Sequence, residues 1–258
     1  MILIFNKIKW ISYALAIILS LGTMACKSEN PVPPASSIVV ATAADLVKVS
    51  EPLAAAFEHR NGIRVTFSFG SSGQLEQQIR QGAPFDVYAP AARSYCESLR
   101  HDGFLEAECT VFALGRLVVL SGGFALESLS ELEDKRIQRI ALANPLHAPY
   151  GLAAQQTLQA VGLWQALEPK FVYADNVAHA LQMAKTGNAE AALVALALVA
   201  KDASSAFLLV DASLHAPIEQ TVTVLKASHN QQGALAFRDF LAGPEARQIL
   251  AAYGFGHP

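Results

Sequence analysis

The sequence has 258 residues, 52% of them hydrophobic and 16% charged, which is enough for one large folded domain or two small ones. This composition excludes a disordered chain, and the formal net charge of -3 argues against a nucleic acid partner, because duplex binding normally needs a basic surplus. The same charge offers no general attraction for anions, so any anion site must depend on local geometry.

The first 25 residues have the pattern of a signal peptide. Two lysines precede an apolar run over residues 10–21, which is too short to cross a membrane as a helix. Ala25 then precedes Cys26, which resembles the lipobox of bacterial lipoproteins, although Thr23 stands where leucine is usual. We therefore expect Cys26 to carry a lipid; the alternative is simple cleavage of the signal peptide and secretion.

Residues 26–36 are predicted to be a flexible tether. The segment contains three prolines and has no apolar periodicity, so it cannot contribute to a packed core. A tether of this kind would keep the folded body close to the membrane while leaving it free to rotate.

From residue 37 onward, β-branched apolar runs alternate with segments of helical periodicity. Strands are predicted at residues 37–42, 64–69, 85–89, 111–121, 139–143, 172–173, 191–196, 207–210 and 220–225. Helices are predicted at residues 45–59, 74–81, 92–99, 129–134, 151–161 and 177–185, followed by a C-terminal helical region that breaks at residues 243–244. This alternation predicts an α/β fold with parallel sheets covered by helices.

The segments near residues 117–121 and 220–225 are the natural places for the chain to cross between two α/β halves. We expect a first lobe over residues 37–118, completed by residues 222–258, and a second lobe over residues 119–221. A cleft between two such lobes is a common place for a small-molecule site.

Two cysteines remain after Cys26, namely Cys96 and Cys109. Thiols of an exported protein meet an oxidising compartment, so a disulfide between them is expected, with two free thiols as the alternative. The seven histidines are scattered without partners at metal-ligand spacing, so no protein-bound metal ion is expected.

Four predicted loops lead directly into helices and are candidates for an anion site. The first loop contains Ala44 and Asp45, and the second contains Ser71 and Ser72. The third loop contains Tyr150, and the fourth ends at Val177. Helix starts present free N–H groups and a partial positive charge. Glycine and serine are also ordinary turn and cap residues, and Asp45 itself is expected to cap its own helix.

Several segments together resemble the periplasmic molybdate-binding proteins of ABC importers. The matching stretches occur in order over residues 38–256; they are ATAADL, FSFGSSGQLEQQIRQGAPFDVY, ANPLHAPYGLAA, YADNVAHAL, GNAEAALVALAL and AFRDFLAGPEARQILAAYGF. The resemblance implies a two-lobed periplasmic-binding-protein fold of type II, in which each lobe is a mixed, mostly parallel sheet flanked by helices. It also implies that neutral donors at helix starts hold a tetrahedral oxyanion.

The resemblance assigns ligand contacts to particular residues. It implies that molybdate is held through the hydroxyl of Ser72, beside Ser71, and through backbone N–H groups of Asp45, Tyr150 and Val177, with Ala44 next to Asp45.

Four positions depart from the family pattern. Asp45 and Pro90 stand where serine is common, Tyr150 stands where other members have alanine, and Ala195 stands where some members have a ligand-binding tyrosine. These departures leave the identity of the anion less certain than its class.

The expected function is therefore that of a monomeric solute-binding protein, not an enzyme, which needs no cofactor and delivers molybdate or tungstate to an ABC permease from the periplasm or cell surface. The same fold binding sulfate, phosphate or a small organic acid is the alternative. A serine hydrolase using Ser71 or Ser72 is a remote alternative, because the sequence lacks a G-x-S-x-G elbow.

Two further residues carry structural expectations. His147 is expected to be solvated, and Arg116 is expected to pair with a carboxylate at the lobe junction.

Overall fold

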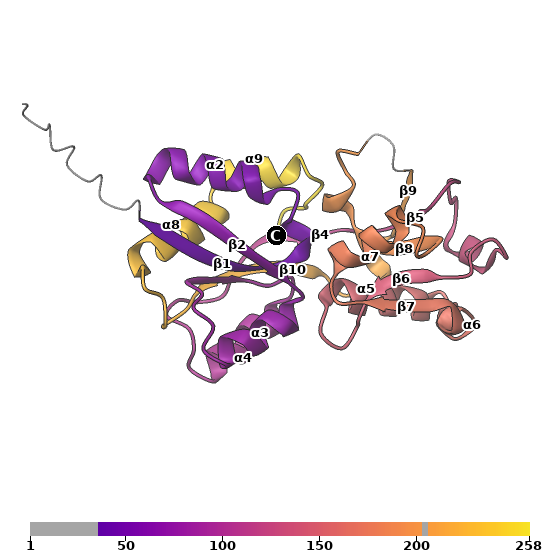
Figure 1. The fold of residues 1–258 in the computed structure, drawn as a ribbon, viewed down its shortest axis with the longest axis horizontal. Helices are drawn as coiled ribbons and strands as arrows, with labels where there is room; N and C mark the ends of the chain where they lie inside the picture. The colour runs from indigo at the N-terminus through magenta and orange to yellow at the C-terminus, as the bar shows by residue number, and fades with distance from the viewer. Residues whose placement is uncertain (1–35, 203–205) are drawn as a thin grey trace, which may run out of the picture. The chain divides into compact units, whose positions relative to one another are not determined.

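The computed structural model describes residues 36–202 and 206–258. The signal peptide, Cys26 and all but the last residue of the tether lie outside the described residues. The described chain forms two five-stranded mixed sheets, each with helices against it, and the chain passes twice between them (Figure 1). Within these two ranges, no helix is both long and apolar enough to cross a membrane.

The first sheet has the strand order β2-β1-β3-β10-β4. Its strands are β1 Ser37–Ala43, β2 Arg64–Gly70, β3 Val87–Ala89, β4 Thr110–Gly115 and β10 Ile218–Val224. Strands β1, β2 and β3 are parallel, and β10 runs antiparallel between β3 and β4. Its helices are α2 Ser50–Asn61, α3 Ser72–Arg80, α4 Arg93–His101, α8 Gln231–Ala242 and α9 Pro244–Ala251.

The second sheet repeats this arrangement with the order β7-β6-β8-β5-β9. Its strands are β5 Leu117–Ser121, β6 Ile140–Ala143, β7 Phe171–Ala174, β8 Ala191–Ala195 and β9 Phe207–Leu209. Strands β6, β7 and β8 are parallel, and β5 runs antiparallel between β8 and β9. Its α-helices are α5 Pro149–Ala160, α6 Trp164–Leu167 and α7 Val177–Lys185. We call the two halves lobe 1, built on the first sheet, and lobe 2, built on the second.

The predicted strand at residues 111–121 is wrong as a single element. It is divided at Arg116 into β4 of lobe 1 and β5 of lobe 2, and the return crossing comes before Ile218. Both crossings therefore lie a few residues earlier than the predicted boundaries. The division occurs beside Gly115, where a Cβ atom would lie 2.3 Å from the Tyr150 hydroxyl. An apolar run cannot reveal this division, because both strands are buried and read as one pattern.

The predicted helix at residues 45–59 begins later than expected. Residues Ala44–Leu46 form a short 3-10 turn, and the α-helix starts only at Ser50. Pro52 explains the delay, because proline fits the first turn of a helix but clashes with the preceding turn in its interior. The predicted helix at 129–134 is likewise a 3-10 turn, Leu129–Glu133, and the short α6 was not predicted.

Hydrophobic cores lie on both faces of the first sheet and around the second. In lobe 1, one core joins the sheet to α2, α8 and α9, and includes Phe57 edge-on to Phe237 with ring centroids 5.0 Å apart. The opposite face packs against α3 and α4. Lobe 2 has its own core.

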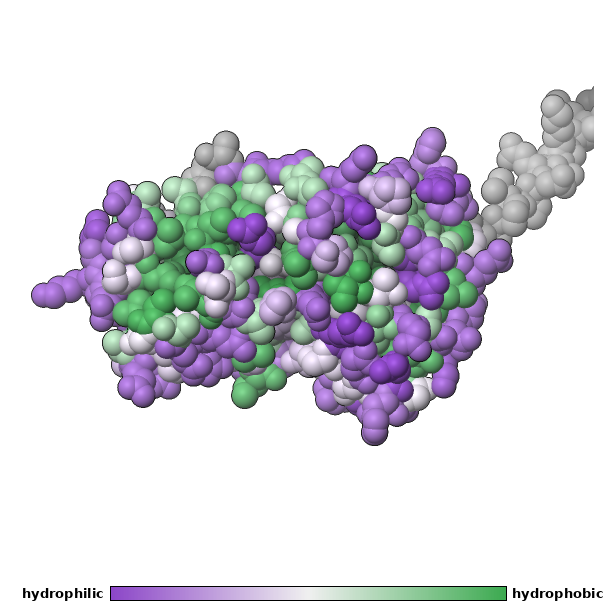
Figure 2. All heavy atoms as spheres, turned by 180° about the vertical axis from the view of Figure 1, so that it is seen from behind, coloured by the Kyte–Doolittle hydropathy of each residue, from purple (hydrophilic) through white to green (hydrophobic). Residues whose placement is uncertain are grey.

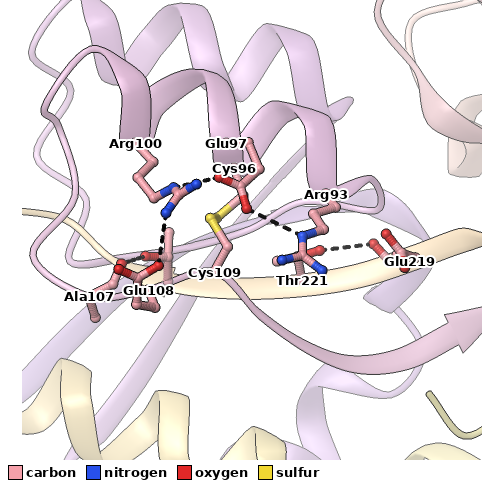
Figure 3. Close-up of a disulfide and its surroundings, with 10 residues drawn as sticks. Arg93, Cys96, Glu97, Arg100, Ala107, Glu108, Cys109, Glu219 and Thr221 are labelled. Carbon is pink, nitrogen blue, oxygen red and sulfur yellow. Dashed lines mark hydrogen bonds and ion pairs between the residues drawn. A yellow bond between two sulfur atoms is a disulfide. The ribbon is translucent and has the colours of Figure 1, made fainter.

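The predicted disulfide between Cys96 and Cys109 is confirmed (Figure 3). It joins α4 to the segment just before β4, with the two Cα atoms 6.0 Å apart. Arg100 spans the same two segments, because it contacts Glu97 on α4 and Glu108 beside Cys109. The disulfide therefore ties one helix of lobe 1 to its sheet, away from the cavity described below.

The surface is more hydrophobic over lobe 2 on the face shown in Figure 2. Six of the seven exposed large hydrophobic residues in the described ranges belong to lobe 2; they are Leu146, Leu152, Val161, Tyr173, Phe207 and Leu209. The two lobes therefore present different surfaces to any partner, although their sheets share one topology.

Candidate anion-binding site

Four strand-to-helix junctions, two from each lobe, surround one small cavity of about 10 Å3. In lobe 1 they follow β1 and β2, and in lobe 2 they follow β6 and β7. All six residues that the sequence singled out line this cavity, namely Ala44, Asp45, Ser71, Ser72, Tyr150 and Val177. The remaining lining residues are Ala43, Gly70, Ala91, Ala148, Pro149 and Asn176.

The topology explains why these segments meet. The carboxyl ends of neighbouring parallel strands open at the same edge of a sheet, and the following helices start there. Each lobe therefore presents two helix or 3-10 starts at one edge, and the two edges face each other across the cavity.

The start of α3 supplies the serine wall of the cavity. Ser71 is the N-cap residue and forms a capping box with Gln74, so its hydroxyl serves its own helix. Ser72 is fully buried, and its Oγ atom accepts the Ala91 N–H at 3.0 Å. Because that bond uses a lone pair, the hydroxyl hydrogen of Ser72 stays free to donate toward the cavity.

The lobe 2 wall presents backbone N–H groups. Asn176 caps α7 by accepting hydrogen bonds from the N–H groups of Ala178 and His179. The Val177 N–H, which comes just before these two, is not used by the cap. On α5, Pro149 has no N–H, and Tyr150 follows it in the first turn. Gly151 allows α5 to lie against β6, because a Cβ atom there would be 2.1 Å from the Ala143 carbonyl oxygen.

A cluster of buried polar groups lies beside this cavity. Asp45 is fully buried, and neither of its carboxyl oxygens has a hydrogen-bond partner; the Tyr150 hydroxyl and the Gln220 amide, also buried, are likewise unpartnered within the described chain. Burial raises the pKa of Asp45 to about 7, although Tyr150, its own backbone N–H and Gln220 are close enough to oppose that shift. The pKa of Tyr150 is raised well above its usual range by burial and by the negative charge of Asp45.

The expected capping role of Asp45 is wrong. The cap positions before the 3-10 turn and before α2 are Ala43 and Val49, and neither start has a side-chain cap. Because Pro52 delays the helix, Asp45 lies inside the 3-10 turn and not at the N-cap position of a helix.

His147 of lobe 2 forms two polar contacts with lobe 1. The His147 carbonyl oxygen accepts the Gly73 N–H at 2.9 Å, and its Nδ1 atom is 2.8 Å from Ser71 Oγ. The approach is close, because a Cβ atom at position 73 would lie 2.9 Å from His147 Cβ. The expectation that His147 is solvated is therefore wrong: it is half-buried and bridges the lobes.

The other residues named from the sequence lie outside the cavity lining. Arg116 occupies the crossing between β4 and β5, and Ala195 is buried at the end of β8. The Pro90 carbonyl oxygen accepts the Thr221 N–H. Sequence reasoning missed Gln220, whose signal is a long amide, next to Glu219, in a strand whose other residues are apolar or β-branched.

The chemistry of the cavity is that of an anion site without cations. No lysine or arginine is among its lining residues. Across the described ranges, no group of three or more His, Cys, Asp or Glu residues is arranged to hold a metal ion. A wider hollow of about 300 Å3 lies next to it, lined partly by Arg93, Tyr95 and Glu219, but it lacks the converging helix starts.

Comparison with known proteins places this architecture in a family. Residues 38–256 match the model of the family described as bacterial extracellular solute-binding protein. The molybdate-binding protein ModA of Rhodobacter capsulatus is 32% identical, and that of Azotobacter vinelandii is 34% identical; each alignment covers 94% of this chain and at least 94% of the relative.

The solved structures agree with this placement. The periplasmic molybdate-binding protein of Azotobacter vinelandii superposes with a TM-score of 0.81 and 31% identity, over 86% of this chain and 99% of that one. The two-lobed type II fold expected from the sequence is thereby confirmed. The chain belongs to the bacterial extracellular solute-binding proteins and is similar over nearly its whole length to the molybdate-binding members.

Proposed function

We propose that this protein captures molybdate or tungstate outside the cytoplasm and delivers it to the permease of an ABC importer. The observation that carries the proposal is the convergence of four helix or 3-10 starts, two from each lobe, on one cavity lined by neither lysine nor arginine. The similarity to named molybdate-binding proteins supports the choice of anion.

Neutral donors suffice to hold such a ligand. Burying a dianion costs much unless its oxygens are hydrogen-bonded, and each bond to a charged group contributes about 1.5–3 kcal/mol. The Ser72 hydroxyl and the backbone N–H groups of Asp45, Tyr150 and Val177 are the donors we assign. Molybdate and tungstate are fully ionised at neutral pH and larger than sulfate, so we expect the cavity to prefer them by size.

Calorimetric titration of the mature protein with molybdate, tungstate, sulfate and phosphate tests the proposal. Molybdate or tungstate should bind and raise the melting temperature, because a ligand at a hundred times its Kd stabilises the folded state by about 2.7 kcal/mol. Sodium chloride at equal ionic strength is the control. A response to sulfate or phosphate, with none to molybdate or tungstate at millimolar concentration, would overturn the assignment.

Phosphate is the alternative ligand that one structural observation favours. The buried Asp45 carboxylate is an acceptor, and an acceptor suits the hydroxyl that hydrogen phosphate carries. The same titration separates the two ligands, because it compares them on one protein sample.

We also propose that the protein acts as a monomer held to the membrane by a lipid on Cys26, in the periplasm or at the cell surface. The proposal rests on the sequence of the leader and tether. Cys26→Ser should release the protein from the membrane fraction, and light scattering should give the mass of one chain. Unchanged fractionation, with an unmodified wild-type N-terminus in mass spectrometry, would contradict lipid anchoring.

The contact between Ser71 and His147 is the one feature that favours a hydrolase. A serine beside an imidazole at 2.8 Å has the spacing of a nucleophile and its base. However, Ser71 already caps α3, and His147 also bonds Gly73 across the lobes, so both residues have structural roles. Turnover of p-nitrophenyl acetate by the wild type, lost in Ser71→Ala, would establish the hydrolase instead.

A further inference from the structure

A buried carboxyl group lines the cavity, and the proposed function assigns no role to it. The Asp45 side chain is fully buried, and both of its oxygens lack a hydrogen-bond partner within the described residues. An unpartnered buried polar group is costly, and such groups are uncommon in native proteins. Asp45 is among the residues that line the cavity, so an anion bound there would lie within reach of the carboxyl group, beside the Tyr150 hydroxyl and the Gln220 amide.

The surroundings of Asp45 favour its neutral form. From its own turn it meets the backbone N–H groups of Asp45 and Leu46, from α5 the Tyr150 hydroxyl, and from β10 the Gln220 amide. None of these groups is charged at neutral pH, and no cation among the described residues offsets the effect of burial, which raises the pKa of Asp45 to about 7. The His147 imidazole also lies near, and it reaches the cavity wall through Ser71.

Binding of a dianion should further favour the neutral, protonated form of Asp45. Two like charges in a poorly solvated cavity repel strongly, so an ionised Asp45 would oppose binding. The protonated group has no charge and gains an O–H donor. One solvent proton joins the carboxylate, and the oxyanion itself keeps all its bonds.

We propose that Asp45 binds the oxyanion as a neutral carboxylic acid, donating its O–H to a ligand oxygen, so that each anion bound above neutral pH brings one proton from the solvent. The inference rests on the proposed function and adds a side-chain contact to the backbone donor already assigned to this residue. It makes Asp45 the group that couples capture of the anion to pH.

Calorimetry of molybdate binding in two buffers of different ionisation enthalpy counts the protons. At about pH 8.5 the wild type should take up about one proton per anion, and at about pH 5.5 almost none, because Asp45 is then already protonated. Between these values the affinity should fall by up to about tenfold per pH unit above about pH 7. Asp45→Asn should bind without proton uptake and with an affinity independent of this transition.

Two control variants separate Asp45 from other charges. Asp175→Asn removes a carboxylate whose side chain is 75% exposed, just before α7, and should keep the wild-type proton count. His147→Gln removes the imidazole that contacts the cavity wall and should keep the wild-type proton count as well. Loss of proton uptake in His147→Gln but not in Asp45→Asn would assign the proton to the histidine and overturn the inference.

The possible outcomes distinguish this inference from the proposed function. Molybdate binding without proton uptake at about pH 8.5 would overturn the inference alone, whereas no binding of molybdate or tungstate at any pH would overturn both. Should Asp45→Asn fail to fold, infrared difference spectra of the wild type still decide. Binding at about pH 8.5 should produce the carbonyl band of a protonated carboxylic acid, and its absence would contradict the proposal.

Discussion

The two halves of the cavity share one strand and helix order but differ in what they offer a ligand. Lobe 1 contributes side chains, namely the carboxyl group of Asp45 and the hydroxyl group of Ser72. Lobe 2 contributes mainly backbone N–H groups at the starts of α5 and α7. Its polar side chains at the cavity are Tyr150 and Asn176, and Asn176 already caps α7. Topology therefore places the helix starts, and the residues at those starts decide the chemistry.

The lobes also differ in how their walls are held in place. The lobe 2 wall depends on backbone contact, since Gly151 lets α5 lie directly on the end of β6. The lobe 1 wall depends on side-chain hydrogen bonds, such as the cap made by Ser71 and the bond from Ala91 to Ser72. Substitutions should accordingly have their largest effects through packing in lobe 2 and through polar groups in lobe 1.

The largest effect is expected for Gly151→Ala in lobe 2. A Cβ atom would lie 2.1 Å from the Ala143 carbonyl oxygen, so α5 must move and the Tyr150 N–H leaves the cavity. We expect a loss of about 3 kcal/mol in stability, the upper end of the typical cost of overpacking, and no measurable anion binding. Gly122→Ala is the matched control in the same lobe, since its Cβ atom would meet atoms only at 3.9 Å. Equal melting temperatures for the two variants would contradict the backbone argument.

The next effect concerns stability and pH, and it belongs to lobe 1. The pKa of Asp45 is about 7 in the folded protein and 3.8 in its ordinary state, so folding takes up a proton between these values. The stability contributed by the protonated group is fully present below about pH 4 and is lost as the pH rises through about 7. The loss is at most about 4 kcal/mol. Urea denaturation from about pH 4 to 8 should show this decline in the wild type relative to Asp45→Asn; parallel curves would contradict it.

A smaller effect is expected for the serine hydroxyl. Ser72→Ala removes one charge-assisted hydrogen bond and should weaken molybdate binding by about 1.5–3 kcal/mol, roughly ten- to a hundredfold. Asp45→Ser removes a buried negative charge and adds a hydroxyl, so binding at about pH 8 should hold or tighten. Titration of both variants checks the pair. Wild-type affinity in Ser72→Ala, together with no binding in Asp45→Ser, would show that the donor set is wrong.

The smallest effect is expected where the two lobes touch. His147→Ala removes the bond to Ser71 Oγ but keeps the backbone bond to Gly73, so the contact between the lobes should lose about 0.5–1.5 kcal/mol. Molybdate affinity should therefore fall about two- to tenfold, chiefly through faster release. Leu146→Ala is the neighbouring control, because Leu146 is 88% exposed. Stopped-flow dissociation rates that match in the two variants would contradict a role for His147 in holding the two lobes together.

Much of the cavity wall was foreseeable from local sequence. GSSG after an alternating strand, and the segment before Val177, mark helix starts because glycine, serine and asparagine have local reasons to stand there. The clustering of Asp45, Tyr150 and Gln220 was not foreseeable, because each lies in a different segment and appears ordinary within it. The contact between Ser71 and His147 joins residues 76 positions apart, and no local sequence pattern predicts it.

The sequence by itself determined the order of strands and helices, because periodicity and turn residues act over a few neighbouring positions. It also determined the two-lobed fold class, through segments that resemble a known family. Only the tertiary structure decided where the run at residues 111–121 divides and which way Asp45 faces. Both depend on packing: Tyr150 occupies the space beside Gly115, and Pro52 delays α2 so that Asp45 stays buried at the cavity instead of capping a helix.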